Sequence, residues 1–529
     1  MDNAVGDLNK CSVDNLFQDM VSRSMTVADH VDAAQSLLTG LLKYNGDFVT
    51  PLIVSSSYFN NAEASSFFES NPQDRLQSYL DLFEFNLDLL SRYLDGSLKA
   101  IGAYNSRELK HYVTALYNTI FSLEGEKLDE FISRQSEMVR NVTKSFPQAI
   151  SDIEPEYGFH FERGENIKFA ETDRFFLYQI MPTDPEVKIR ENRKPVIIIP
   201  PFVLGSNILA FLPGEKRSYA HSFANQGIPT YIRIMKDINT TPLFQVMTME
   251  DDARDTRMFC EKVKERHGKM VTLNGYCQGG YTAVCNILSG ELDGLVDALI
   301  TCVSPMDGTR SKGLGPFLKA LPPRFNDLIY GTKTLGNGNK VADGNLMGWV
   351  YKLKSIENEA PMVRFFRDLS MVAAANGNTV KISKTAAALN YWLKYERSDL
   401  PLSITKMSFA SYNIPVTDDG TLPVKMFGRN LNFKGIAEKK ILWLICYGEN
   451  DDLVEKETAL APLDYIEAEV TPFPKGHVAI ATSWSHPESE YALHKRFGKN
   501  NYRGPVRYQL DLDDAMEKTM SSEKTKKRR

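Results

Sequence analysis

The sequence predicts an α/β fold in which helices cover both faces of a mostly parallel sheet. Two observations carry this prediction. Short apolar runs that suit buried strands alternate with helical stretches at intervals of roughly 30 residues, as in doubly wound β-α-β units. Between one such run and the next helix stands Gly275-Tyr-Cys-Gln-Gly-Gly280, a cysteine flanked by glycines. This arrangement matches the strand-to-helix elbow of α/β-hydrolases, G-x-S-x-G, with cysteine in place of serine.

Length and composition are those of a globular protein with one large domain and additions, or with two to three domains. The chain has 529 residues, of which 43% are hydrophobic and 24% are charged. A formal net charge of -5 argues against a surface built for nucleic acid, which would be basic with clustered Lys and Arg. No apolar run approaches the roughly 18 residues that a transmembrane helix needs. We therefore expect no nucleic-acid partner and no transmembrane segment.

The usage of cysteine and histidine bears on the compartment and on metal binding. The six cysteines show no zinc-like C-x-x-C spacing, and the first twenty residues contain no apolar core of a secretory signal. We therefore expect free thiols and a cytoplasmic protein. No group of histidines and carboxylates has the spacing of metal ligands, so no metal is expected.

Residues 1–150 are predicted to form a helical N-terminal domain. Its clearest helix begins at Asn71-Pro72, a cap residue followed by proline in the first turn. Apolar residues then recur three or four positions apart in two neighbouring stripes: Leu76, Leu80, Phe83, Leu87, Leu90 and Leu94 in one, and Tyr79, Leu82, Phe85, Leu89 and Tyr93 in the other. Because more than one face is apolar, we expect core packing between elements. The alternative is a surface for a protein partner or an apolar polymer.

Residues 151–511 are predicted to form the α/β domain. Antiparallel edge strands at 157–161 and 175–181 open it, on either side of a turn-like segment. Apolar runs then mark the strands of a parallel sheet, at 195–201, 229–235, 269–273, 296–303, 441–447 and 466–470. The elbow directly follows the third of these runs. The cysteine therefore stands after a strand and before a helix, where a hydrolase carries its nucleophile.

The strand pattern is interrupted between about residues 308 and 437 by a long section rich in helix and loop. Segments inserted at the carboxyl ends of strands carry the specificity in such folds, so we interpret this section as a helical cap over the active site. Residues 512–529 include a run rich in Ser, Lys and Arg, and are predicted to be a disordered basic tail.

Three residues from separate segments form a candidate catalytic triad: Cys277, Asp451 and His477. The nucleophile of a cysteine enzyme is the thiolate, whose formation is favoured at a helix N-terminus and by an imidazole base. His477 follows the last predicted strand and Asp451 follows the strand before it. This gives the chain order nucleophile, acid, histidine of α/β-hydrolases. Asp452 is the alternative acid.

The fold also predicts two backbone donors for an oxyanion hole. One is the N–H of Gln278, directly after the nucleophile, and the other is an N–H of the loop after the strand at 195–201, near Val203. The remaining cysteines lie mostly in predicted strands or helices and are interpreted as small buried hydrophobes.

The segment from about Lys194 to His477 resembles the catalytic domain of polyhydroxyalkanoate synthases, α/β-hydrolase-like enzymes with a cysteine nucleophile. Four stretches carry the resemblance: 275–280 resembles the lipase-like box of the family, 200–204 with 208–215 its double-proline strand end and the segment after it, 450–454 the loop of its catalytic aspartate, and 476–478 the turn of its histidine. The family usually has a histidine directly after the aspartate, where this chain has Asp452.

The resemblance implies acyl transfer from an (R)-3-hydroxyacyl-coenzyme A through a thioester on Cys277, with release of coenzyme A and growth of a polyester. Coenzyme A is then part of the substrate, and no separate cofactor is implied. The polyester chain or granule surface is the implied partner, and a homodimer the implied assembly. Two alternatives remain open: a cysteine-type hydrolase that uses the same triad on water, either a thioesterase or an intracellular polyester depolymerase, and a non-catalytic relative that binds granules.

Overall fold

The computed structural model describes residues 35, 42, 71–321, 331–373 and 382–515, which fall into two compact units. The larger unit contains the described residues of 55–85, 154–354 and 388–529, and the smaller unit those of 1–54, 86–153 and 355–387. The section predicted as a cap, 308–437, is therefore divided, because its middle part belongs to the smaller unit.

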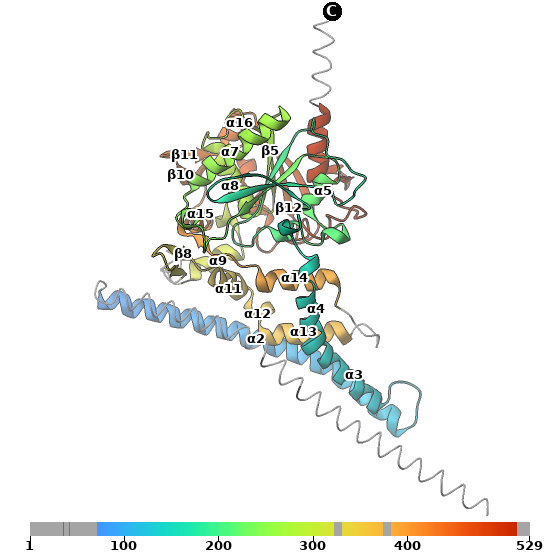
Figure 1. Cartoon of the computed structure of the whole chain (residues 1–529). Helices are drawn as coiled ribbons and strands as arrows, with labels where there is room; N and C mark the ends of the chain where they lie inside the picture. Colours follow the sequence, from blue (N-terminus) through green and yellow to red (C-terminus); the bar gives the residue numbers. More distant parts are fainter. Residues whose placement is uncertain (1–34, 36–41, 43–70, 322–330, 374–381, 516–529) are drawn as a thin grey trace, which may run out of the picture. The chain divides into compact units, whose positions relative to one another are not determined.

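An eight-stranded sheet forms the centre of the larger unit (Figure 1). Its strands stand in the order β1-β2-β4-β3-β5-β6-β12-β13. They are β1 (Ile167–Glu171), β2 (Phe175–Ile180), β4 (Thr230–Met235), β3 (Val196–Ile199), β5 (Val271–Tyr276), β6 (Val296–Cys302), β12 (Leu442–Gly448) and β13 (Glu469–Phe473). β2 pairs antiparallel with β1 and β4, and all other neighbours are parallel. This is the α/β-hydrolase fold that the sequence predicts.

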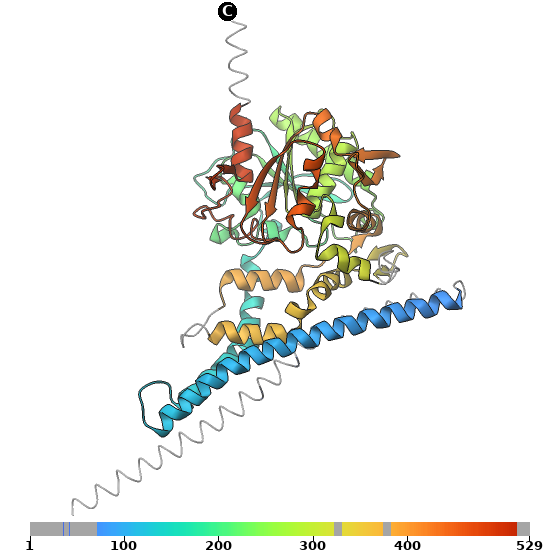
Figure 2. The same ribbon diagram turned by 180° about the vertical axis from the view of Figure 1, so that it is seen from behind.

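Helices flank the sheet (Figure 2). They are α5 (Tyr219–Ala224), α6 (Pro242–Gln245), α7 (Met249–His267), α8 (Gln278–Leu288), α16 (Lys434–Glu438) and α17 (Lys456–Ala459). The ends of α7 show why these residues form a helix of this length. The Thr248 side chain accepts the N–H of Asp251 in a capping box, and Gly268 ends the helix at a φ of 66°. All four residues of β3 are fully buried, as a strand covered on both faces must be.

The part of the inserted section that belongs to the larger unit adds helices and short strands. They are α9 (Leu314–Ala320), β7 (Thr332–Thr334), β8 (Lys340–Ala342), α11 (Gly344–Lys354), β9 (Leu400–Pro401), α15 (Leu402–Asn413), β10 (Thr421–Met426) and β11 (Arg429–Asn432). α14 (Lys384–Tyr395) contains residues of both units. After β13 come the paired strands β14 (Arg496–Phe497) and β15 (Tyr502–Arg503).

A helix at residues 505–515 follows these strands and contacts the chain just before β3. The Asp513 carboxylate accepts the backbone N–H of Lys194 at 3.0 Å, and Gln509 donates to the Lys194 carbonyl at 2.9 Å. Lys194 Nζ is buried and donates to the Met270 carbonyl at 2.7 Å. The first residues of the predicted tail are thus packed against the sheet, whereas 516–529 lie outside the described residues.

The smaller unit is helical. Its helices include α3 (Leu128–Arg140), α4 (Phe146–Asp152), α12 (Ile356–Glu359) and α13 (Pro361–Ala373), together with most of the 49-residue helix α2 (Pro72–Ile120). A π-helical turn, Asn141–Ser145, joins α3 to α4. Tyr104 of α2, Val142 and Phe365 of α13 share one buried cluster. Residues 1–70 of the predicted N-terminal domain, apart from Gln35 and Leu42, lie outside the described residues.

The structure corrects two expectations. The first stripe of α2 is not a core surface, because its six residues, from Leu76 to Leu94, are 48–63% exposed, and it is Leu89 of the second stripe that is buried. Residues 157–161 do not form the first edge strand, whose place is taken by β1. Tyr157 and Phe159 instead use their rings for packing, edge-on against Phe211 at 6.3 Å and stacked on Phe161 at 5.1 Å.

Candidate active site

Cys277 occupies a strained turn between β5 and α8. Its φ and ψ are 52° and -127°, values that a non-glycine residue holds only where the surrounding structure enforces them. A Cβ at Gly275 would overlap the backbone of Gly280, and one at Gly279 would overlap the carbonyl oxygens of Ile199 and Pro200. Glycine is therefore sterically required at positions 275 and 279.

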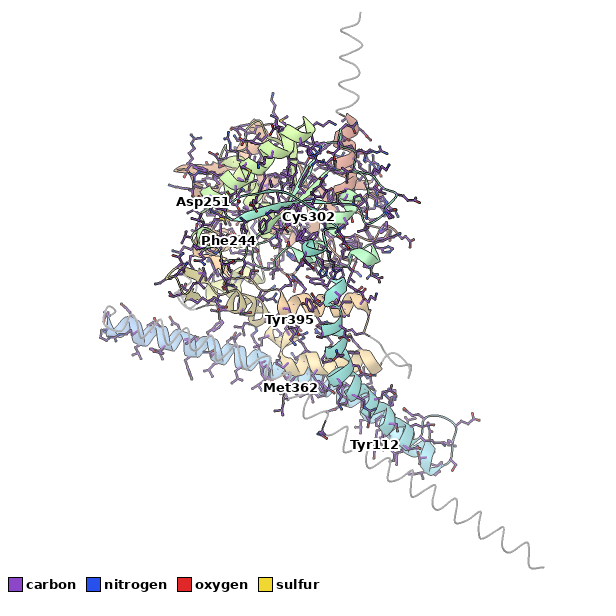
Figure 3. All side chains as sticks on the ribbon, in the orientation of Figure 1. Tyr112, Phe244, Asp251, Cys302, Met362 and Tyr395 are labelled. Atoms are coloured by element: carbon purple, nitrogen blue, oxygen red, sulfur yellow. The ribbon has the colours of Figure 1, made fainter. Side chains whose placement is uncertain are left out.

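The elbow leaves the Cys277 thiol accessible. Cys277 is half-buried, whereas the other cysteines in the described part of the chain, Cys260, Cys285, Cys302 and Cys446, are buried. Burial raises the pKa of Cys260 to about 12, so that thiol does not ionise at neutral pH. The Cys277 N–H donates to the Cys302 carbonyl at 2.8 Å, which fixes the turn to the end of the neighbouring strand β6. Figure 3 labels Cys302 among the side chains of the larger unit.

His477 and Asp451 meet at the carboxyl ends of two neighbouring strands. Asp451 follows β12 and His477 follows β13, and His477 Nδ1 lies 2.8 Å from Asp451 Oδ2. The other carboxylate oxygen, Oδ1, accepts the N–H groups of Leu453 and Val454, each at 2.9 Å. The buried Asp451 side chain is therefore held by three hydrogen bonds and can orient the imidazole ring.

The second nitrogen of the ring, His477 Nε2, is buried and has no hydrogen-bond partner among the residues that the structure describes. Burial lowers the pKa of His477, but the Asp451 carboxylate and then the Cys277 sulfur outweigh it, and the pKa lies well above its usual 6.5. The Asp451 carboxylate therefore favours the protonated form of the imidazole, and the Cys277 sulfur acts in the same direction.

The structure distinguishes the two candidate acids. Asp452 is exposed, and its backbone carbonyl accepts a hydrogen bond from Lys354 Nζ of α11. Asp451 alone of the two is bonded to His477. The backbone of His477 is also held from the nucleophile side, because the Tyr276 hydroxyl donates to the His477 backbone carbonyl at 2.7 Å.

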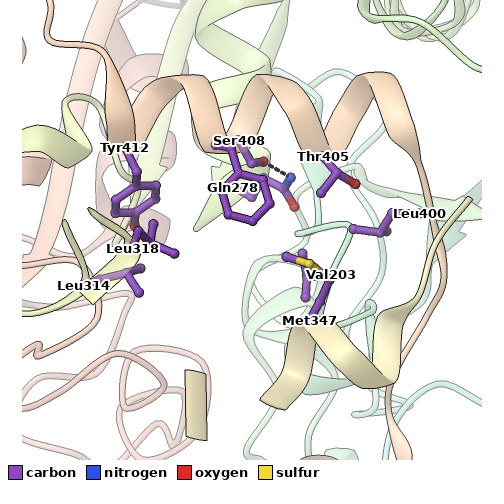
Figure 4. Close-up of a pocket in the computed structure, with 10 residues that line it drawn as sticks. Val203, Gln278, Leu314, Leu318, Met347, Leu400, Thr405, Ser408 and Tyr412 are labelled. Carbon is purple, nitrogen blue, oxygen red and sulfur yellow. Dashed lines mark hydrogen bonds between the residues drawn. The ribbon is translucent and has the colours of Figure 1, made fainter. Parts of the chain in front are cut away.

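The two predicted oxyanion residues line one pocket (Figure 4). Gln278 is the first residue of α8, so its backbone N–H has no acceptor within the helix. Val203 is buried in the loop after β3. The other lining residues come from the inserted section and are mainly apolar: Leu314, Leu318, Met347, Leu400, Thr405, Ser408, Phe409 and Tyr412.

The cavity in this pocket has a volume of about 30 Å³. That is room for about two water molecules, so a larger ligand would require the lining residues to move apart. An apolar wall with few polar groups is the usual lining of a site that binds an apolar chain.

Two contacts of the site carry no signal in the sequence. The Gln278 side chain accepts the N–H of Phe202 at 3.1 Å and donates to Ser408 Oγ, which lies 130 positions further along the chain. Lys354 contacts the acid loop from α11. No local motif marks Ser408 or Lys354, because their partners come from distant segments.

The described residues contain no cluster of three or more His, Cys, Asp or Glu side chains able to hold a metal ion. Nor does any helix among them have the length and apolar character required to cross a membrane.

Comparisons with known proteins returned only structural likeness. No protein-family model matches the sequence, and no curated protein matches it either. Among solved structures, a carboxylesterase from Nitrososphaera gargenis is 13% identical, with a TM-score of 0.34, over 60% of this chain and 92% of its own. A carboxylesterase from Bacillus subtilis is 11% identical, with a TM-score of 0.32, over 65% of this chain and 93% of its own. An esterase from a Rhodococcus species is 10% identical, with a TM-score of 0.32, over 67% of this chain and 98% of its own. Likenesses this weak carry no argument about activity, and the fold assignment rests on the sheet order and the elbow.

Proposed function

We propose that this chain is a cysteine-dependent acyltransferase that polymerises (R)-3-hydroxyacyl groups taken from coenzyme A thioesters, in the manner of polyhydroxyalkanoate synthases. The observation that carries the proposal is the strained elbow of Cys277 together with the bond between His477 and Asp451. The resemblance of residues 194–477 to the synthases supplies the substrate class.

In the proposed first half-reaction, His477 takes the thiol proton and the Cys277 sulfur attacks the thioester carbonyl. The backbone N–H groups of Gln278 and Val203 receive the oxyanion. When the tetrahedral species collapses, the bond between the acyl carbon and the coenzyme A sulfur breaks. The departing sulfur takes a proton from His477, and the acyl group remains on Cys277.

In the second half-reaction, the hydroxyl of another 3-hydroxyacyl group attacks the Cys277 thioester and gives its proton to His477. The ester bond forms, the bond from carbon to Cys277 sulfur breaks, and the thiolate is restored. Water in place of that hydroxyl would give hydrolysis. The apolar pocket supports transfer over hydrolysis, because it restricts water near the acyl carbon.

The departure from the family pattern at Asp452 falls on an exposed side chain that takes no part in the His477–Asp451 contact. A change at this position leaves the pairing of base and acid unaltered. This supports the proposed synthase function, although Asp452 stands where the family usually has a histidine.

Incubation of the purified protein with (R)-3-hydroxybutyryl-coenzyme A tests the proposal. Polymer and free coenzyme A are expected in parallel, and Cys277→Ala is expected to abolish both. A cysteine hydrolase is the second candidate, favoured by the incomplete burial of Cys277. Free 3-hydroxybutyrate without polymer would refute polymerisation and assign a thioesterase, and degradation of added polyester would assign a depolymerase.

The exposed stripe of α2 supports a granule surface as the partner and a cytoplasmic, granule-associated location. Six large apolar side chains in a row are an unusual surface for a helix that contacts only water. Binding that persists in a Cys277→Ala variant is expected for this surface, and such binding without any turnover by the unmodified protein would favour the non-catalytic relative. The homodimer stays a proposal from the resemblance.

A further inference from the structure

We infer that the side chain of Gln278 is a positioning residue that couples helix α15 of the inserted section to the oxyanion hole; the inference rests on the proposed function. Its carboxamide bonds in two directions. Oε1 accepts the backbone N–H of Phe202 at 3.1 Å, and Nε2 donates to Ser408 Oγ of α15 (Figure 4). One side chain thus joins the elbow, the loop after β3 and the inserted helix.

The bond to Phe202 fixes the residue directly before Val203, the second proposed oxyanion donor. The ring of Phe202 is held separately, with the Arg233 guanidinium at 5.5 Å and the Phe175 ring at 6.3 Å. With ring and N–H both restrained, the peptide that joins Phe202 to Val203 has little freedom to rotate. Gln278 is buried, so water cannot readily replace its oxygen as the acceptor.

The bond to Ser408 brings the inserted section into this network. Thr405, Ser408 and Tyr412 stand three and four positions apart on α15 and therefore share the helix face that lines the pocket. An acyl chain that enters the pocket must displace this face, because the cavity is too small for it. The displacement acts through Ser408 on the Gln278 carboxamide. Occupancy of the pocket is thereby linked to the orientation of the Val203 N–H.

The same contacts allow an opposite role, which the experiment separates. If Gln278 Oε1 blocked the oxyanion hole by occupying the Phe202 N–H, its removal would accelerate acylation. If it orients the Val203 donor, its removal slows acylation. Gln278→Met keeps the length of the side chain and removes both hydrogen bonds, so the direction of the rate change decides between the two.

The experiment measures coenzyme A release from (R)-3-hydroxybutyryl-coenzyme A and, in parallel, alkylation of Cys277 by iodoacetamide. Alkylation needs the thiolate and no oxyanion hole. For Gln278→Met we expect kcat to fall by about tenfold to a hundredfold, which is less than the fall in kcat when an oxyanion-hole donor itself is removed. KM and the alkylation rate should each change by less than about threefold. Ser408→Ala should show a smaller fall of the same kind, and Ser408→Thr, which keeps the hydroxyl, should restore the rate.

Ser411→Ala is the matched control. Ser411 lies on α15, is buried, and donates to the Ser408 carbonyl rather than to Gln278. Its loss should leave kcat unchanged. A faster or unchanged kcat in Gln278→Met would overturn the inference, as would equal losses of kcat and alkylation, which would indicate damage to the thiol. Failure of the proposed function is seen separately, because turnover would then survive Cys277→Ala or be absent in the unmodified protein.

Discussion

Replacing Asp451 with asparagine tests the proposed roles of Asp451 as the acid and His477 as the base of the triad. In the structure Oδ1 of Asp451 accepts two backbone N–H groups, and Oδ2 faces His477 Nδ1. An asparagine that keeps its carbonyl oxygen on the two N–H groups must turn its NH₂ toward Nδ1. Two donors cannot share a hydrogen bond, so the imidazole must carry its proton on Nε2 instead. That tautomer cannot take the proton from Cys277.

The expected loss in coenzyme A release is about a thousandfold to ten-thousandfold, as for other triads with an inverted tautomer. This corresponds to about 4 to 5.5 kcal/mol, at 1.36 kcal/mol for each factor of ten. The attraction between two unit charges at the observed 2.8 Å is about 6 kcal/mol for an effective dielectric constant of 20, which is of the same size as the expected loss.

The assay is single-turnover release of coenzyme A, with the thermal unfolding midpoint as a check on the fold, which the two retained backbone bonds should preserve. Asp452→Asn is the matched control and should be unchanged, because its side chain is exposed. Asp451→Asn activity within tenfold of the unmodified protein would refute the tautomer argument.

Three further predictions follow from the site. Because the Asp451 carboxylate outweighs burial and raises the pKa of His477 above 6.5, the stabilisation from this pair is complete below pH 6.5 and is lost as pH rises through the folded pKa; the thermal unfolding midpoint should therefore fall as pH rises above 6.5, and should fall less in Asp451→Asn. Gly279→Ala forces a Cβ into two backbone carbonyls and should cost about 3 kcal/mol in denaturant unfolding together with all activity; a folded, active variant would contradict the elbow geometry. Leu318→Ala widens the pocket and should raise the relative kcat/KM for 3-hydroxyhexanoyl over 3-hydroxybutyryl thioesters by about tenfold, while an unchanged ratio would place the acyl chain elsewhere.

The strands of the parallel sheet could be predicted because burial on both faces demands continuous apolar runs. β3, β5 and β12 follow runs of this kind. The edge strand β1, Ile-Lys-Phe-Ala-Glu, has no such run, and the aromatic alternation at 157–161 imitates an edge strand although it serves ring packing. The prediction that the first stripe of α2 packs in the core was wrong for another reason. Periodicity predicts a helix with an apolar face, but it does not predict what covers that face.

The positions of the candidate site residues could be predicted only as far as chain order and strand ends allow. Asp451 and Asp452 occupy the same loop in sequence, and only their side-chain surroundings separate them: one is buried against His477 and the other is exposed. The role of the Gln278 side chain could not be predicted, because its partners Phe202 and Ser408 are brought to it by tertiary packing.

The helix at residues 505–515 has a consequence for how the larger unit assembles. The bond between Lys194 and Asp513 spans 319 positions of the chain, and it closes over the start of β3, a strand in the interior of the sheet. A ribosome delivers the sheet strands long before it delivers that helix. Until then the backbone N–H of Lys194, at the start of β3, lacks its acceptor Asp513, and the Lys194 carbonyl lacks its donor Gln509. We therefore expect the helix at residues 505–515 to dock after the strands have paired, and truncation near residue 505 to leave every strand present but the Lys194 N–H without its Asp513 acceptor.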